Sequence, residues 1–403
     1  MRARPDGLVV AILLTMLSAL GPITTDLYLP SLPAIGQALR ADVETVQLTL
    51  SVYVVAFGFA QLLYGPLSDR FGRRPALLLG IGIYLAATFA CMMATSIESL
   101  IAARFAQAFG GCAGPVLARA VVRDVYGRDR SAVMLSYIGS AMAVAPAVGP
   151  ILGGWLQELY GWRASFGVLF GFSAAAFAGT WFLLDETLSR RDLHAMRPFR
   201  ILSNLIIMLR HREALGYVVV CASAYCGLFA WISGSSHVFV AVMGLTPTQY
   251  GMIFAVNVVG YIVGAQIGGR VTTRLGIPRT VGIGAMIAAL FGIVIAVLAY
   301  ALPLNIPGLL IPMVCLMIGV GLVLPNAMAG AIGPFPEMAG AASALMGFAM
   351  FGLAAFAGMA VAWAFDGTAR PMALIIGLGG VISFLFYLTL IRPVAKAAGQ
   401  KVL

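Results

Sequence analysis

The stretch that decides the fold is residues 65–75, which read G-P-L-S-D-R-F-G-R-R-P. It separates two long apolar runs, 44–66 and 75–95. Each run has the roughly 20 residues that a helix needs to cross the hydrocarbon core of a bilayer. The glycines allow a tight turn, and the arginines suit the anionic cytoplasmic leaflet. The stretch therefore predicts a cytoplasmic loop between two membrane-spanning helices.

The composition of the whole chain extends this prediction. Of its 403 residues, 61% are hydrophobic and only 10% are charged, whereas soluble domains are about 25% charged. The apolar runs are continuous and lack the alternation of a transmembrane barrel. A helix also satisfies its own backbone hydrogen bonds in lipid. We therefore predict an all-α, polytopic membrane protein surrounded by the lipid bilayer.

The apolar runs predict twelve transmembrane helices, at 8–30, 44–66, 75–95, 98–120, 131–157, 162–184, 215–241, 247–270, 279–301, 306–332, 338–364 and 370–392. A polar stretch lies between the sixth and the seventh. We therefore predict a six-helix half at 1–184, a central cytoplasmic loop at 185–214 and a second six-helix half at 215–403.

Lysine and arginine predict the orientation in the membrane. Of the 25 such residues, all but Arg40, Arg104, Arg163 and Arg370 fall on one side of the predicted spans. That side is expected to be cytoplasmic, with both termini on it. The distribution explains the net charge of +10 as a topology signal, so no nucleic acid partner is expected.

One acidic and one basic residue, Asp26 and Arg104, lie well within the predicted spans. A charge there is costly, so Asp26 is a candidate proton carrier, unless the first span ends near it and leaves it in external water. Arg104 needs a partner or a wet cavity because arginine does not deprotonate. Gln107 shares its helix face, and Arg104 is a candidate for organising a polar network that senses the charge of Asp26. The alternative is a purely structural hydrogen bond.

Two glycine-rich stretches are candidate moving parts. In 65–75, Asp69 is expected to bond to the N-terminus of a neighbouring helix and to latch the halves in one state. In 145–154, prolines and glycines kink a helix and allow close packing. The candidate residues are Gly65, Asp69, Arg70, Gly72, Arg73 and Arg74 in the first stretch, and Pro146, Gly149, Pro150, Gly153 and Gly154 in the second.

Several polar or aromatic residues within the spans are candidates for a substrate pocket, although each also suits packing. They are Tyr28, Tyr53, Gln107, Tyr137, Tyr225, Trp231, Asn257, Tyr261 and Asn326. The five cysteines form no C-x-x-C pair, so neither a disulfide framework nor a metal site is expected. No Gly-Lys-Ser/Thr phosphate loop and no catalytic cluster is present. We therefore expect no enzyme and no cofactor, with an ion or solute gradient as the energy source.

These segments together resemble the major facilitator superfamily, and more narrowly its bicyclomycin/chloramphenicol-resistance (Bcr/CflA) branch of drug:proton antiporters. The resemblance covers essentially the whole chain. It rests on 25–33 (T-D-L-Y-L-P-S-L-P), 65–75, 104–107 (R-F-A-Q), 123–126 (R-D-V-Y), 145–154 and 335–343 (F-P-E-M-A-G-A-A-S). The stretch 65–75 resembles the superfamily's gating motif, and 145–154 resembles its antiporter motif. Two departures are Ala108, where the family often has glycine, and Thr273, where Asp69 would recur in the second half.

The resemblance implies export of hydrophobic or amphipathic drugs, such as chloramphenicol or bicyclomycin, in exchange for protons by alternating access. It implies proton coupling through Asp26 and Arg104, the proton gradient as energy source, and a monomer in the bacterial cytoplasmic (inner) membrane. Two alternatives remain open. One is a proton-coupled or facilitative transporter of a small organic nutrient or metabolite. The other is a non-transporting scaffold or sensor, which would tolerate loss of both Asp26 and Arg104.

Overall fold

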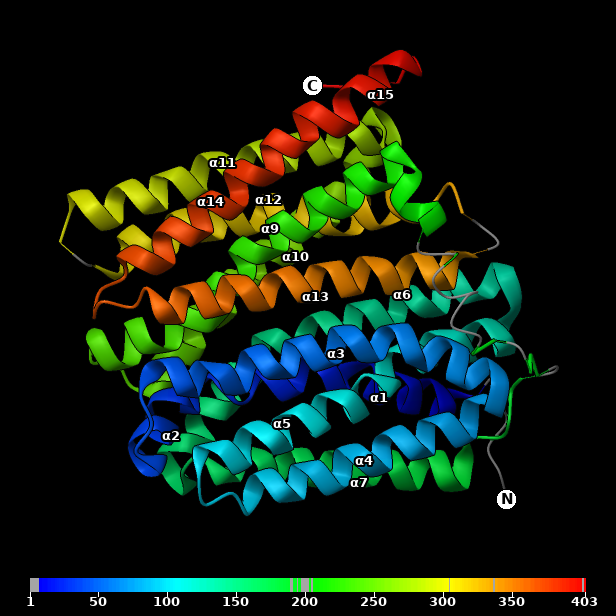
Figure 1. Ribbon diagram of the computed structural model, residues 1–403, viewed down its shortest axis with the longest axis horizontal. Helices are drawn as coiled ribbons and strands as arrows, with labels where there is room; N and C mark the ends of the chain where they lie inside the picture. The colour runs from blue at the N-terminus through cyan, green and yellow to red at the C-terminus, as the bar shows by residue number, and fades with distance from the viewer. Residues whose placement is uncertain are drawn as a thin grey trace. The chain divides into compact units, whose positions relative to one another are not determined.

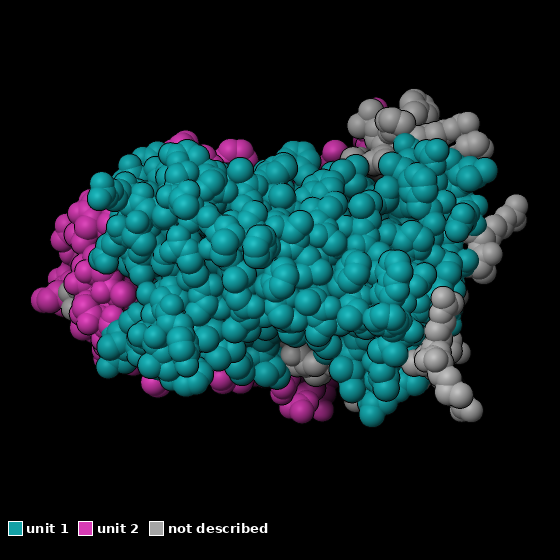
Figure 2. Space-filling model, turned by 90° about the horizontal axis from the view of Figure 1, so that it is seen from below, with its two compact units in different colours: residues 1–201, 246–251 teal, residues 202–245, 252–403 magenta. Residues whose placement is uncertain are grey.

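The computed structural model describes residues 7–188, 191–193, 195–196, 203, 206–303, 305–335, 338–400 and 402–403, apart from the side chains of 127–133, 135–137 and 140–143. Within these residues every regular element is helical. Contacts group the chain into two compact units, Met1–Ile201 with Thr246–Gly251, and Leu202–Leu245 with Met252–Leu403 (Figure 2).

The first unit holds the helices that precede the central polar stretch (Figure 1). They are α1 (Leu8–Asp26), η1 (Leu29–Ser31), α2 (Leu32–Leu39), α3 (Val43–Phe71), α4 (Arg73–Met92), α5 (Ile97–Gly111), α6 (Ala113–Tyr160) and α7 (Arg163–Leu183). In Figure 1 they run from blue at α1 to green-cyan at α7.

The second unit holds the remaining helices (Figure 1), except that the first residues of α10 group with the first unit. They are α9 (Arg212–Ser236), η2 (His237–Val242), α10 (Pro247–Leu275), α11 (Ile277–Ala301), α12 (Ile306–Ile332), α13 (Ala339–Trp363), α14 (Arg370–Phe386), η4 (Tyr387–Ile391) and α15 (Arg392–Ala397).

The helices have the length and composition of membrane spans. Within the described residues, 11 segments are long and apolar enough to cross a bilayer. They correspond to eleven of the twelve predicted spans. The remaining prediction, 131–157, falls within α6, where some side chains lie outside the described part of the chain.

Two boundaries differ most from the sequence predictions. The first span does not end at residue 30 but continues to Leu39. Pro30 and Pro33 do not stop it because each lies in the first turn of a new helix, η1 or α2, where a missing N–H removes no hydrogen bond. The predicted fourth and fifth spans are joined without a non-helical loop, since α6 is helical from Ala113 to Tyr160.

Apolar side chains follow one exposed face of α11. Met286, Leu290, Ile293 and Val297 are between 40% and 56% exposed, and they recur at intervals of four, three and four residues. This interval places them on one face of a helix. In water such a stripe would be unfavourable, whereas in a bilayer it is the lipid-facing surface.

Helices of the second unit approach one another at glycines. A Cβ atom on Gly260 would meet the carbonyl oxygen of Val314, and one on Gly264 would meet that of Ile318, one turn further along α12. Small residues at such positions let helix backbones approach closely, which is the main source of helix association in lipid. The glycines of α10 therefore pack directly on α12.

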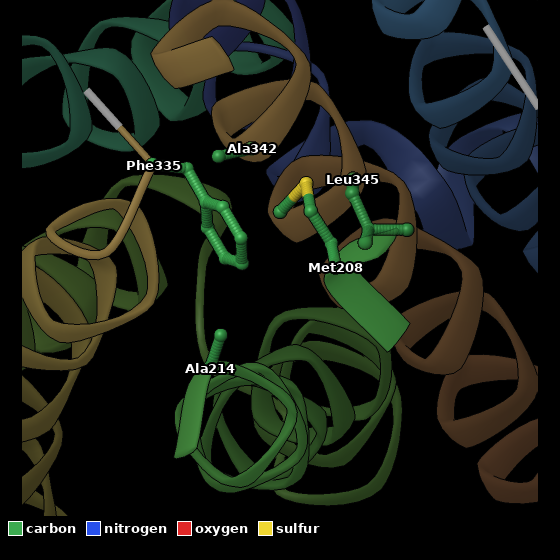
Figure 3. Packing of buried hydrophobic residues seen from close by; sticks show 5 residues of the cluster. All are labelled: Met208, Ala214, Phe335, Ala342 and Leu345. Carbon is green, nitrogen blue, oxygen red and sulfur yellow. The ribbon is translucent and has the colours of Figure 1, made fainter. Parts of the chain in front are cut away.

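A separate apolar cluster joins the ends of α9, α12 and α13 (Figure 3). It consists of Met208, Ala214, Phe335, Ala342 and Leu345. The Phe335 ring lies near the centre of the cluster, with the Met208 and Leu345 side chains beside each other (Figure 3).

We predict that Gly264→Ala lowers the midpoint of thermal unfolding in detergent, at a cost of about 1–3 kcal/mol. The added methyl group meets the backbone of α12 at Ile318, which has no rotamer to change. Gly171→Ala, in the interior of α7, is the matched control because nothing lies within 4 Å of its added Cβ. Equal unfolding midpoints for the two variants would contradict close packing of α10 on α12.

Candidate functional site

Asp26 lies at the last residue of α1 and is only 5% exposed. The chain continues helically to Leu39 within the same candidate span. Asp26 is therefore surrounded by protein. Its burial argues against the alternative interpretation, in which it lies in external water.

The second glycine-rich stretch packs against this acidic residue. A Cβ atom on Gly149 of α6 would lie 2.9 Å from the Asp26 Cβ atom, and one on Gly153 would meet the carbonyl oxygen of Leu27. Any larger side chain at these positions would push α6 away from the end of α1. Asp26 and the stretch 145–154, which are 119 or more residues apart in sequence, thus form one site.

The other members of this stretch lie further along α6. Pro146 and Pro150 are inside the helix. The Pro150 carbonyl oxygen lies where a Cβ on Gly251 would fall, and the Pro247 carbonyl oxygen lies where a Cβ on Gly154 would fall. Residues 246–251 belong to the same compact unit as α6.

Arg104 of α5 is completely buried. Its Nη1 donates a hydrogen bond to Oε1 of Gln107 at 2.6 Å, so the expected contact within one helix face is present. Its guanidinium carbon lies 4.5 Å from the ring centroid of Tyr28 and 4.2 Å from that of Tyr53. Aromatic faces attract cations, and more strongly where water is excluded. The charge is therefore held by the two rings and by one amide.

Hydroxyl groups extend this network across four helices. Gln107 Nε2 donates to Thr88 Oγ1 at 2.9 Å. The Tyr28 and Thr49 hydroxyls are 2.5 Å apart, and those of Thr24 and Tyr84 are 2.6 Å apart. The network thus joins α1, α3, α4 and α5 around the Arg104 guanidinium.

Four members of this network, Thr24, Thr49, Tyr84 and Thr88, were not among the candidates predicted from the sequence. A signal was available, because threonine and tyrosine recur four residues apart in three spans: Thr24 with Tyr28, Thr49 with Tyr53, and Tyr84 with Thr88. Residues four apart share a helix face, so this spacing indicates faces that carry two hydroxyl groups each.

The stretch 65–75 forms the end of α3 and the start of α4. Arg73, 8% exposed, lies between two carboxylates. Its Nη1 is 2.6 Å from Asp69 Oδ1, and its Nε is 2.9 Å from Asp124 Oδ2. Nη1 also donates to the Ser68 hydroxyl at 2.6 Å. A charge-assisted network of this kind ties α3, α4 and α6 together at one end of the unit.

The prediction that Asp69 binds a helix N-terminus differs from what the structure shows. Asp69 pairs with Arg73, four residues on, and it is Glu186 that binds a helix N-terminus. The backbone N–H groups of Arg73 and Arg74 donate to Glu186 Oε1 and Oε2 at 2.9 and 3.3 Å. Gly72, the residue before α4, has no side chain with which to cap it. A carboxylate from elsewhere therefore satisfies these donors and interacts favourably with the positive end of the helix dipole.

Gly72 is required in this arrangement for two reasons. Its φ of +108° is rarely adopted by other residues, and a Cβ there would collide with the Glu186 carboxylate. The remaining members have local contacts. The guanidinium carbon of Arg70 lies 5.2 Å from the ring centroid of Phe71, and Arg74 donates to the Trp181 carbonyl at 2.8 Å. Gly65 has open space where a Cβ would lie.

The candidate pocket residues of the second unit have separate contacts. Asn326 accepts from Thr272 Oγ1 at 2.7 Å, and Asn257 donates to its own helix at Ile253. Tyr225 packs edge-on against Phe351, with ring centroids 5.5 Å apart. The other candidates of this unit are Trp231, buried edge-on against Phe239, and Tyr261, which is partly buried. The side chain of Tyr137 lies outside the described residues.

The fold and the site define a polytopic helical membrane protein with buried ionisable groups among its spans, as secondary transporters have. The family model of the Major Facilitator Superfamily matches residues 13–359, and the chain belongs to that superfamily. A bicyclomycin resistance protein homolog of Haemophilus influenzae is 32% identical, covering 99% of this chain and 100% of that protein. A chloramphenicol resistance protein of Pseudomonas aeruginosa is also 32% identical, covering 83% and 79%. The predicted resemblance to this branch is confirmed.

Solved structures support the fold alone. A peptide transporter POT in complex with sulfate has a TM-score of 0.77 at 14% identity, covering 99% of this chain and 98% of that one. The predicted all-α major facilitator fold is therefore confirmed.

We predict that Glu186→Ala lowers stability by about 0.5–2 kcal/mol, the usual effect of removing a helix cap. The reason is that the N–H groups of Arg73 and Arg74 lose their acceptors. Glu186→Gln keeps one acceptor oxygen and should lose less. Thermal unfolding in detergent measures both, and a glutamine variant as unstable as the alanine variant would contradict the capping role.

Proposed function

We propose that this protein exports hydrophobic or amphipathic drugs, of the chloramphenicol or bicyclomycin kind, in exchange for protons. The observation that carries the proposal is the Asp26 carboxyl group, buried at the end of α1 against Gly149 of the antiporter-like stretch. Relatives that match most or all of the chain and are named for bicyclomycin and chloramphenicol resistance support drug export over uptake of a nutrient.

The mechanism is alternating access. With the site open to the outside, Asp26 takes up a proton; with the site open to the cytoplasm, it releases that proton as the drug binds. Drug and proton need not touch, because each need only disfavour occupancy by the other, and such coupling is reciprocal. The proton gradient supplies the energy, and no cofactor takes part.

The cytoplasmic network around Arg73 has a place in this cycle. It holds the ends of α3, α4 and α6 together through two carboxylates, Asp69 and Asp124. Exchange of these partners between the two access states would move these helix ends relative to one another. We place this network and both termini on the cytoplasmic side of a bacterial inner membrane, because arginine and lysine gather there, and we propose a monomer.

The proposal predicts drug-driven proton flux that depends on Asp26. Inside-out vesicles with an acidified lumen and a trapped pH dye should lose their gradient when chloramphenicol, florfenicol, bicyclomycin or a lipophilic cation is added outside. With Asp26→Asn, the response should fall to that of vesicles without the protein. Asp26→Glu, which keeps a carboxyl group, should retain part of it. If drug enters equally well in Asp26→Asn without proton movement, the protein is a facilitator.

The contact between α6 and α1 gives an independent prediction. Gly149→Ala adds a methyl group 2.9 Å from the Asp26 Cβ, so the carboxyl group must move. We expect slower drug-driven proton flux, with drug binding to the purified protein reduced less than the flux. Gly171→Ala, whose added Cβ meets nothing within 4 Å, serves as the control. An unchanged flux in Gly149→Ala would remove α6 from the coupling site.

A further inference from the structure

The guanidinium group of Arg104 is held on several sides by other side chains. Two aromatic rings, Tyr28 and Tyr53, lie within 4.5 Å of its central carbon. Its Nη1 is fixed by Gln107, which is fixed in turn by Thr88. The orientation of the group is thus set by Tyr28 and by residues of α3 and α4 as well as by its own helix, α5.

One edge of the guanidinium group is left over. Nε and Nη2 are buried, and neither has a hydrogen-bond partner among the described residues. These two nitrogens share an edge of the planar group, and their N–H bonds point in parallel. This edge is the one with which arginine binds two oxygens of one acceptor at once.

An unsatisfied buried donor is unfavourable, and more so when it carries charge. Among the described residues, the partners of Arg104 are two aromatic faces and one amide oxygen, and neither Nε nor Nη2 is bound by a carboxylate. A suitable acceptor would therefore bind favourably beside Nε and Nη2, in the plane of the guanidinium group.

We propose that this free edge of Arg104 binds a group of the exported compound that presents two coplanar oxygens, such as a carboxylate or an aromatic nitro group. The identification of the ligand as the exported compound rests on the proposed function. Arg104 is then a specificity-determining residue, and the transporter discriminates against compounds in which that group is replaced by a hydrogen-bond donor.

Direct binding tests this inference without requiring transport. Radiolabelled chloramphenicol, which bears an aromatic nitro group, is titrated onto the purified protein in lipid nanodiscs. It is then displaced by unlabelled chloramphenicol or by the analogue whose nitro group is reduced to an amine. A second pair, nalidixic acid and its carboxamide, tests the carboxylate. We expect the two-oxygen member of at least one pair to bind about tenfold more tightly, because its partner leaves both donors unsatisfied.

Two variants separate the contributions. Arg104→Lys keeps the positive charge but lacks the two-donor edge, so the preference should fall to less than about twofold. Gly171→Ala, whose added Cβ meets nothing within 4 Å, is the control and should keep the preference of wild type. A preference that survives in Arg104→Lys would overturn the inference.

The wild-type protein alone is decisive if a variant does not fold. Equal affinity within both pairs, or binding of no member of either pair, overturns the inference. It would mean that water satisfies Nε and Nη2 of Arg104. Drug-driven proton flux without any such preference would reject this inference but keep the proposed function. Preferential binding without proton flux would keep the role of Arg104 in binding but reject the proposed proton-coupled export.

Discussion

The first unit depends on the burial of one permanent positive charge. Arg104 does not lose its proton in a protein, and a charge in the middle of a span is costly. Its neighbours must therefore supply what water would. Two tyrosine rings and an amide do so, and the hydroxyl pairs behind them extend the polar contacts over four helices. The packing of α1, α3, α4 and α5 is in this sense arranged around the guanidinium group.

The position of Asp26 follows from a different constraint, the close approach of α6. Where Gly149 and Gly153 face the end of α1, the two backbones are separated by no side chain of α6. In lipid, such contacts replace the hydrophobic effect as the source of helix association. A contact this close makes the surroundings of the Asp26 carboxyl group sensitive to small movements of α6, which a coupling site requires.

The sequence predicted the parts of this fold that depend on local pattern. Long apolar runs predicted the spans, and the glycine stretches predicted close packing. The partners could not be predicted, because they come from distant segments. Nothing in 65–75 indicates that Glu186 caps α4, since the capping residue follows by more than one hundred positions. Because Glu186 could not be foreseen, Asp69 was predicted to bind the helix N-terminus in its place. The salt bridge between Asp69 and Arg73 could have been predicted, because residues four apart share a helix face.

Charge is distributed unevenly between the two units. Among the described residues, each buried aspartate, glutamate, lysine or arginine, namely Asp26, Arg73 and Arg104, belongs to the first unit. The buried polar groups of the second unit are hydroxyls, amides and His237. The same asymmetry exists at the ends of α3 and α10, where Thr273 stands in the position that Asp69 occupies in the first half. Under the proposed mechanism, proton binding and helix-end pairing are functions of the first unit. The second unit would then contribute neutral aromatic surface, such as the packed Tyr225 and Phe351 rings, whose large apolar area suits hydrophobic ligands.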